Sequence, residues 1–312
     1  MRGEHTGAVA APTARGGEPT GTDLPLFLLM SLIWGSTWIA AKVGIGSMPP
    51  VLFSAVRYTV VGVVLLVAVR GIVPLLRGRL GGQVLVTGLL VNTGTYALLL
   101  WGMQHVATGV AGLVNMTMIV VGLYGLALLR GEEVPSWRHA MSLLLGIGGL
   151  VALFAGRIDL RGNPMELWGI LAIILGSLCY CMGSVLSRPL LATANPLQLT
   201  GAQALTGAVG LIVLSALLEP LSLETLHRAL HPAPLASLGF MVVFGTFVAY
   251  TIYLRLMRNW GSARAGLYAF VSPVVALVLG HLVFGEALGP RQILGAALML
   301  GAAALAVRRP GA

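Results

Sequence analysis

The chain has 312 residues, of which 57% are hydrophobic and 9% are charged, and its mean hydropathy is +0.92. So few charged residues could not cover the surface of a soluble domain, which excludes a soluble enzyme and indicates an integral membrane protein. In a soluble protein the formal net charge of +9 would suggest a nucleic-acid or acidic partner, so the positions of the charges decide its meaning.

The first 23 residues are rich in Gly, Ala, Thr and Pro and lack the apolar core of a cleavable signal peptide. We therefore expect residues 1–23 to form a disordered cytoplasmic tail. Ten apolar runs follow, each close to the roughly 20 residues that a helix needs to cross the hydrocarbon. They lie at about 24–43, 51–69, 84–103, 106–128, 139–156, 166–187, 197–218, 235–256, 262–284 and 291–307. The predicted fold class is all-α, an integral membrane protein with ten transmembrane helices.

The two halves of the chain carry the same pattern. At an offset of 146 residues, Ser31, Pro50 and Arg57 fall on Ser177, Pro196 and Gln203. The offset then becomes 154, and Tyr96, Met103 and Glu132 fall on Tyr250, Met257 and Glu286. Each copy has five spans, an odd number, so the second copy must lie upside down in the membrane. The sequence therefore predicts two inverted five-helix repeats, at 24–156 and 166–307, with a central site between them.

The positive charges sort by side of the membrane. Thirteen of the 19 Lys and Arg residues lie in the two tails and in the loops on the same side as the tails. Five lie on the other side, and Arg57 lies within a span. By the positive-inside rule, both termini are expected in the cytoplasm of a multi-pass inner-membrane protein. The basic character then reflects topology, and no nucleic-acid partner is expected.

Signals for metals, disulfides and catalysis are weak. Cys179 and Cys181 lie two residues apart on one predicted helix and point in different directions, so we expect neither a disulfide nor a metal site. We interpret the loop at about 219–234, which carries His227 and His231, as solvated. An intramembrane enzyme would need a nucleophile, a base and an orienting group within reach of each other, and the sequence offers no such set. We expect no enzyme activity, no catalytic residue and no cofactor.

Large polar and aromatic residues inside the spans are candidates for a substrate cavity, because such groups are costly in lipid and usually face the protein interior. At the offset of 154 residues, Asn92 and Tyr96 in the third span fall on Thr246 and Tyr250 in the eighth. The large candidates are Asn92, Tyr96, Tyr250 and Tyr253, together with Asn115 in the fourth span. We expect these five to line a wet cavity that the two halves share. Hydrogen-bonded packing between helices is the alternative.

Two tryptophans and one arginine join this predicted substrate-binding set. Trp34 and Trp38 lie too deep in the first span for an interfacial aromatic belt, so they either line the cavity or pack. Arg57 lies about seven residues inside the second span, where its guanidinium could snorkel to the membrane surface or face the cavity. Its counterpart Gln203 is uncharged, so any recognition of charge would be asymmetric.

Proton coupling has one candidate. His281 is the one histidine clearly inside a span, and an imidazole can change charge near neutral pH; a packing histidine is the alternative. The sequence places no Asp or Glu in the middle of a span, so a carboxylate-driven proton path is not expected. Glu132 and Glu286 follow the fourth and ninth spans, where we expect them to bond loop backbone and fix the turn.

Short motifs stand at characteristic places in the spans: Trp34-Gly35-Ser36, Pro50 through Arg57, Gly245 through Tyr253, Ser272-Pro273 and Gly285-Glu286. Together with the five-plus-five repeat, they resemble the EamA-type exporters of the drug/metabolite transporter superfamily over about residues 24–307. The resemblance implies a basket of spans one to four and six to nine around a central cavity, with spans five and ten at the periphery. Ile119 stands where the family often has a second proline matching Pro273, which implies a straighter fourth span.

The resemblance also implies a function, the export of small metabolites, often amino acids or related compounds. With the repeat, it predicts an inner-membrane transporter that works by alternating access through the central cavity. The expected partners are a small-molecule substrate and the lipid bilayer, and a homodimer is left open. The alternative is an exporter or flippase of drug-like or lipid-linked compounds, which a side opening toward lipid would favour.

Overall fold

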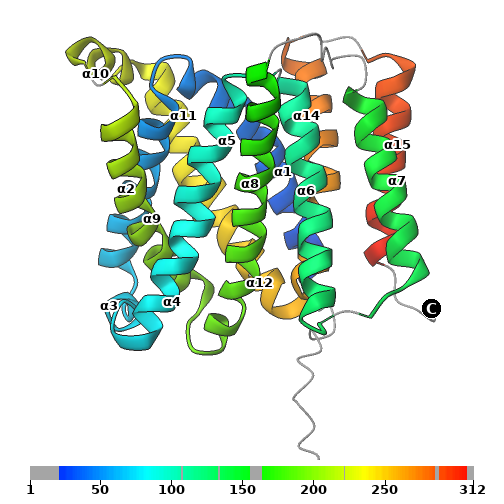
Figure 1. Cartoon of the computed structure of the whole chain (residues 1–312), viewed down its shortest axis with the longest axis horizontal. Coiled ribbons are helices and arrows are strands. Elements are labelled where there is room, and N and C mark those ends of the chain that lie inside the picture. Colours follow the sequence, from blue (N-terminus) through cyan, green and yellow to red (C-terminus); the bar gives the residue numbers. More distant parts are fainter. Residues whose placement is uncertain are drawn as a thin grey trace, which may run out of the picture.

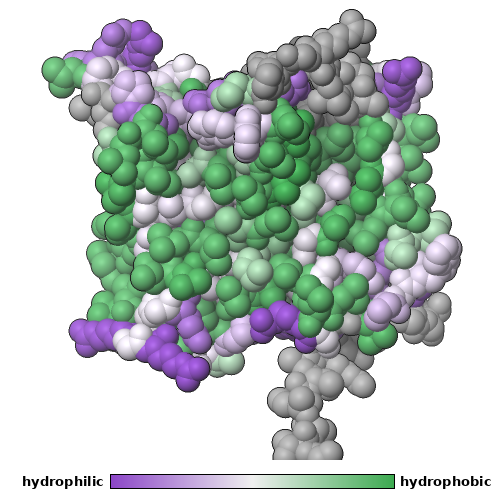
Figure 2. Space-filling view, viewed as in Figure 1, coloured by the Kyte–Doolittle hydropathy of each residue, from purple (hydrophilic) through white to green (hydrophobic). Residues whose placement is uncertain are grey.

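The structure is a computed structural model that describes residues 21–106, 108–132, 134–154, 164–220, 222–284 and 288–307. Within these ranges the chain forms helices and no strand. The helices stand side by side as a bundle (Figure 1). A hydrophobic belt separates two hydrophilic ends (Figure 2), and apolar residues such as Leu129 and Val67 are 85% and 84% exposed. Such a surface is stable only against lipid.

The helical elements follow the predicted order. The first half contains α1 (Asp23–Ile45), α2 (Pro50–Ala68), α3 (Ile72–Leu75), α4 (Gly78–Gly88), η1 (Leu89–Gly94), α5 (Thr95–Met103), α6 (Thr108–Leu129) and α7 (Trp137–Phe154). The second half contains α8 (Pro164–Ser187), η3 (Pro189–Ala192), α9 (Pro196–Leu218), α10 (Leu223–Ala229), α11 (Pro232–Val242), η4 (Val243–Val248), α12 (Ala249–Trp260), α13 (Ser262–Ala265), α14 (Tyr268–Phe284) and α15 (Pro290–Val307). Each predicted span coincides with one helix or with a run of consecutive ones.

Eight helical runs among the described residues are long and apolar enough to cross a membrane. They are Asp23–Ile45, Pro50–Ala68, Gly78–Met103, Ala111–Leu129, Met165–Ala192, Pro196–Leu218, Pro232–Trp260 and Ser262–Leu279. Pro290–Ala306 is a shorter apolar helix, and the apolar part of α7 is shortened by Arg138 and His139 in its first turn. The all-α membrane fold is confirmed with eight candidate spans, whereas the count of ten stays a prediction.

The helix pairs that pack between the two halves follow the sequence repeat. α1 packs against α14, and α8, which matches α1 in the sequence repeat, packs against α6, which matches α14. α2 lies beside α9 and α7 beside α15, at opposite edges of the bundle in Figure 1. The last pair is close, since a Cβ at Gly149 would lie 2.7 Å from the carbonyl oxygen of Gly295. These pairings join each half to the other.

Two π-helical segments interrupt helices at corresponding positions. η1 follows the 11 residues of α4, η4 follows the 11 residues of α11, and each segment has 6 residues. π-helical turns are rare and occur often at functional sites. Asn92 lies in η1 and Thr246 in η4, and both are buried. The two segments therefore place polar side chains in the interior.

The ends of some elements differ from expectation. α1 begins at Asp23, the last residue of the predicted tail, and residues 1–20 lie outside the described ranges. Glu286 and the side chain of Trp38 also lie outside what the structure describes. α6 is continuous, whereas the matching segment is divided into α13 and α14, with Pro273 inside α14. The division falls at Gly266 and Leu267, before Pro273, so it does not test the straighter span expected from Ile119.

Candidate substrate-binding site

A hydrogen-bonded contact between the two halves holds Arg57 in the interior of the bundle. Arg57 lies in α2 and is only 4% exposed. Its Nε and Nη2 both donate to Oγ1 of Thr246 in η4, at 2.9 and 2.7 Å. Thr246 in turn donates to the carbonyl oxygen of Met241 at 3.1 Å. The π-helical segment of the second half thus presents the hydroxyl that binds the guanidinium of the first.

Two tyrosine rings flank the same guanidinium. Cζ of Arg57 lies 5.0 Å from the ring centre of Tyr58 and 5.7 Å from that of Tyr96. The two ring centres are 5.4 Å apart. The face of an aromatic ring attracts a cation at these distances. None of the ion pairs among the described residues joins Arg57 to a carboxylate, so its neighbours are neutral.

Gln203, which matches Arg57 in the repeat, lies in a hydrogen-bonded network in α9. The hydroxyl of Tyr250 donates to its Oε1 at 2.8 Å, and its Nε2 donates to Oγ of Ser187 at 2.6 Å. The backbone carbonyl oxygen of Gln203 accepts a hydrogen bond from Nδ2 of Asn92 at 2.9 Å. Gln203 is fully buried. Both ends of its side-chain amide have a partner, as a buried amide requires.

An aromatic cluster surrounds Tyr253, next to this network. The ring centre of Tyr253 lies 5.4 Å from that of Trp34, 5.8 Å from those of Tyr180 and Tyr268, and 6.0 Å from that of Tyr250. Rings at such separations attract one another. The cluster joins α1, α8, α12 and α14, which belong to both halves.

Three hydroxyl oxygens of this region are buried without a hydrogen-bond partner among the described residues. They are Oη of Tyr180, Oη of Tyr253 and Oγ of Ser184. They lie near one another but do not form well-aligned hydrogen bonds. Leaving a buried polar group unpaired costs about 1–3 kcal/mol. The cluster therefore offers hydrogen bonds to a water molecule or to a polar group of a ligand.

Gly245 connects the aromatic cluster to the cation. Its carbonyl oxygen accepts a hydrogen bond from Nε1 of Trp34 at 3.1 Å. A Cβ at this position would lie 3.3 Å from Nη2 of Arg57, closer than most real Cβ contacts. Glycine therefore allows η4 to approach the guanidinium and the indole at the same time.

The predicted residues separate into two connected groups and three outliers. Arg57 lies with Tyr96, and Gln203 lies with Asn92, Tyr250, Tyr253 and Trp34. Asn115 is separate, since its Nδ2 donates to Oγ of Ser177 at 3.0 Å between α6 and α8. His281 lies in the last turn of α14 with an exposed side chain, and the side chain of Trp38 is not described. The bonds of Asn92 and Asn115 join neighbouring helices, and the lining of a cavity by these two residues stays a prediction.

Three tyrosines of this region, Tyr58, Tyr180 and Tyr268, were not among the predicted residues. Tyr58 directly follows Arg57, and an aromatic residue beside a charge within a span is a usable signal. Tyr180 and Tyr268 are the sole tyrosines of α8 and α14. No spacing along the chain indicates that both rings contact Tyr253, because that contact depends on how four helices pack.

Two carboxylates connect the halves at one end of the bundle, which we call the Glu132 end. Glu132 forms an ion pair with Arg188, lies 3.5 Å from Nε of Arg130, and accepts a hydrogen bond from Oγ of Ser262 at 3.2 Å. This differs from the expected bond to loop backbone, because the ends of α6 and α8 lie close enough for side chains to pair.

The second carboxylate at the Glu132 end belongs to Asp23. It lies 3.6 Å from Nε of Arg255 and accepts from Nδ2 of Asn259 at 3.3 Å. At the opposite end, Glu219 accepts from the backbone amides of Val51 and Leu52 at 2.7 Å, and so caps the start of α2. Interactions between charged side chains thus join the halves at the Glu132 end, and a helix cap joins them at the other.

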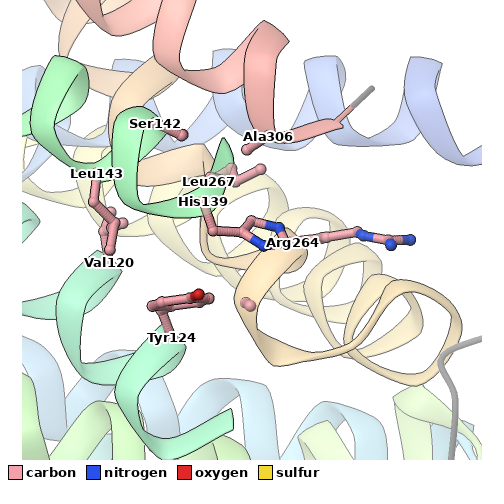
Figure 3. A pocket seen from close by; sticks show the side chains of 9 residues that line it. Val120, Tyr124, His139, Ser142, Leu143, Arg264, Leu267 and Ala306 are labelled. Carbon is pink, nitrogen blue, oxygen red and sulfur yellow. The ribbon is translucent and has the colours of Figure 1, made fainter. Parts of the chain in front are cut away.

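Two hollows lie apart from these groups. The one in Figure 3 has a volume of about 20 Å³ between Tyr124, His139 and Arg264, which is room for about one water molecule. The other, about 270 Å³, lies between α2 and α9 and is lined by Leu52, Ala55, Val56, Thr59, Val60, Ile212, Ser215 and Ala216. Neither lining includes a predicted substrate-binding residue.

Known proteins are similar to this chain in sequence, and a solved structure is similar to it in fold. The uncharacterized inner membrane transporter YedA of Escherichia coli (strain K12) is 29% identical over 276 residues, which cover 85% of each chain. A probable amino-acid metabolite efflux pump of the same organism is 24% identical and matches 89% of this chain and 92% of its own. A solved crystal structure with 22% identity superposes with a TM-score of 0.78 over 92% of this chain and 97% of the other, which shows a shared fold.

The model of the EamA-like transporter family matches the chain twice, at residues 23–155 and 167–308. These two matches cover most of the sequence. The family and the names of the relatives indicate a transporter rather than an enzyme, and a multi-pass protein of the inner membrane. This chain belongs to the EamA-like transporter family.

Proposed function

We propose that this protein exports small metabolites, amino acids or related compounds, by alternating access. The observation that carries the proposal is the buried contact between the halves, in which Arg57 meets Thr246 and Gln203 meets Asn92. A substrate bound at this contact would touch both halves. Rocking of one half against the other would then open the site to each side of the membrane in turn.

The halves that move are, in this proposal, two inverted five-helix repeats at 24–156 and 166–307. Three features support them. The pairing of α1 with α14 is repeated by the pairing of α8 with α6. The segments η1 and η4 stand at the same offset as Tyr96 and Tyr250. One family model matches each half.

The Glu132 end is the cytoplasmic gate in this proposal. The sequence count assigns 13 of the 19 Lys and Arg residues to the tails and loops expected on this side, which favours the cytoplasm. Each of its two ionic contacts joins one half to the other: Glu132 to Arg188, and Asp23 to Arg255. Loading from the cytoplasm therefore requires both contacts to separate.

A transport assay tests the function. Purified protein in liposomes is given labelled amino acids, their carboxamides, simple amines and sugars, and counterflow uptake is measured. We expect saturable uptake of at least one class, unchanged by Ser142→Ala, which removes a hydrogen bond between α7 and α15 away from the site. Uptake no higher than in protein-free liposomes for every class would refute metabolite transport.

A reporter-fusion experiment tests the topology. Reporters at residue 312 and in the 157–165 loop are expected on opposite sides of the membrane, the first in the cytoplasm. Finding both reporters on one side would contradict the five-helix repeat without affecting the transport assay.

Export of lipid-like compounds would need a side opening into the site. The groove between α2 and α9 faces outward, but its lining contains Thr59 and Ser215 as its only hydroxyl side chains and none of the site residues. This groove does not favour the lipid-exporting alternative.

A further inference from the structure

We propose that Arg57 binds the carboxylate of the transported substrate, so that the substrate class is small organic monocarboxylates, amino acids included. The inference rests on the proposed transport function and adds the chemistry of its site. It starts from a buried cation to which no carboxylate is paired among the residues that the structure describes.

The position of Arg57 makes this lack of an anion unusual. Seven residues of α2 precede it, so it lies roughly 10 Å from the start of the helix. It is 4% exposed. A charged side chain inside a membrane span is costly unless an opposite charge or strong hydrogen bonds stabilise it.

Other arginines of the chain do have carboxylate partners although they are more exposed. The side chain of Arg188, which pairs with Glu132, is 12% exposed, and that of Arg255, which pairs with Asp23, is 43% exposed. The more deeply buried Arg57 has a hydroxyl and two rings instead. Among the described residues no carboxylate pairs with Arg57, and we infer that a bound substrate supplies the negative charge.

Snorkelling does not account for Arg57. Two hydrogen bonds join its Nε and Nη2 to Thr246, on the other half of the bundle, and hold the guanidinium inside. A purely structural clamp between α2 and η4 is the competing explanation. It predicts that substitutions at position 57 change stability without changing which ligands are bound.

The donor geometry of the guanidinium suits a carboxylate. The group has five N–H donors in one plane; two of them, on Nε and Nη2, bond Thr246, and Tyr96 lies beside the group. A planar fork of N–H donors matches the two oxygens of a carboxylate. Arg57 supplies one positive charge, which balances a monocarboxylate, whereas a phosphomonoester would bring about 1.5 to 2 negative charges.

The surroundings indicate an apolar body on the substrate. Tyr96 and Trp34 are partly exposed while most of their neighbours in the site are buried. Tyr96 lies over the guanidinium, and Trp34 reaches it through Gly245. A ligand whose carboxylate meets Arg57 would place its remaining part against these rings.

The test measures binding separately from transport. Full-length protein in lipid nanodiscs is titrated with acid and amide pairs of equal shape: benzoate and benzamide, isovalerate and isovaleramide, leucine and leucinamide. Intrinsic tryptophan fluorescence and the midpoint of thermal unfolding report binding. We expect at least one acid to bind roughly tenfold or more tightly than its amide, the size expected for a charge-assisted hydrogen bond.

Variants then assign this preference to Arg57. In Arg57→Gln, which copies the residue of the matching position, acid and amide should bind equally. Arg57→Lys should retain part of the preference, and Ser142→Ala all of it. If Arg57→Gln fails to fold, the test rests on the difference between acid and amide affinities in the wild-type protein and on the reduced difference expected in Arg57→Lys.

Two results would overturn the proposal: amides binding as tightly as acids, or an unchanged preference in Arg57→Gln. Absence of binding by every acid also overturns it, whether or not the transport assay finds uptake. Uptake of amines or sugars but not of acids would support the proposed transport function and would refute the binding of a substrate carboxylate by Arg57. These outcomes therefore distinguish a failure of the carboxylate-binding proposal from a failure of the proposed transport function.

Discussion

Arg57 in α2 and Gln203 in α9 occupy matching positions of the two halves and have opposite surroundings. Arg57 carries a charge and has only neutral partners. Gln203 is neutral, and both ends of its amide are bonded, to Tyr250 and Ser187. At the same position of the repeat, Arg57 therefore carries a charge without a carboxylate partner among the described residues, whereas Gln203 completes a hydrogen-bonded network with Tyr250 and Ser187. The repeat determines where a polar group enters the interior, and the partners determine whether it can bind a ligand.

The largest effect is expected from moving the charge into the completed network. Gln203→Arg would bury a second cation between Tyr250 and Ser187 without an anion. Uncompensated burial of a charge costs about 3–5 kcal/mol, so expression and the midpoint of thermal unfolding in nanodiscs should fall sharply. A Gln203→Arg protein as stable as wild type would show that the interior tolerates cations, and would weaken the argument from Arg57.

Removing the network without adding charge should have a smaller effect. Gln203→Leu keeps the volume and leaves the Tyr250 hydroxyl and the Ser187 side chain without this partner, at a cost of about 1–3 kcal/mol. We expect lower thermal stability and an unchanged preference for acids over amides. A lost preference with unchanged stability would instead place Gln203 in contact with substrate.

The ring over the guanidinium gives a finer distinction. Tyr96→Phe keeps the ring face, so acid affinity should change by less than about twofold, whereas Tyr96→Leu removes a cation–π contact of about 0.5–2 kcal/mol. That corresponds to roughly two- to thirtyfold weaker binding, measured by fluorescence titration. Equal affinities of the Phe and Leu variants would contradict a role for the ring face.

Arg188 extends the comparison to a cation that does have a carboxylate. Glu132→Gln should weaken the contact between α6 and α8 by about 1 kcal/mol, since the pair is only partly exposed. Cys181, whose Sγ lies 3.6 Å from the carbonyl oxygen of Ile119, should then react about fivefold faster with a small thiol reagent, measured in a Cys179→Ser background.

The control for this experiment is Glu224→Gln. The Glu224–Arg228 pair is 73% and 65% exposed, so its loss should not change the labelling rate of Cys181. Faster labelling in both variants would point to a general loosening of the protein rather than to a gate at Glu132.

The smallest effect is expected at His281. Its side chain is exposed in the last turn of α14, apart from the buried groups around Arg57. His281→Gln keeps hydrogen-bonding capacity and removes the titration, so the pH profile of counterflow uptake should remain the same. A flattened profile with normal expression would assign His281 to proton coupling.

The apolar pattern predicted the helices well because a run of about 20 apolar residues has few stable alternatives in lipid. The 154-residue offset likewise placed Asn92, Tyr96 and Tyr250 in matching elements. The hydrogen bonds between the halves could not be predicted from the sequence. Arg57 and Thr246 are 189 residues apart in sequence, and nothing in either span indicates that one bonds the other.

The π-helical segments were also missed, for a physical reason. A π turn changes which backbone carbonyl accepts a bond from which amide, and the side-chain pattern of η1 and η4 remains that of an apolar helix. Asn92 and Asn115 were expected to line a wet cavity because their side chains are polar. Their amides bond the carbonyl oxygen of Gln203 and the hydroxyl of Ser177, partners that only the packing of the helices supplies.

The matching positions of η1 and η4 have a consequence for the history of the chain. A π-helical segment is rare, so two independent origins at the same offset in two copies would be an unusual coincidence. One origin in an ancestral protein that corresponded to one half of the chain, followed by gene duplication and fusion, accounts for both. The ancestor then already had this distorted third helix, and the charge at position 57 and the amide at position 203 diverged on a shared scaffold.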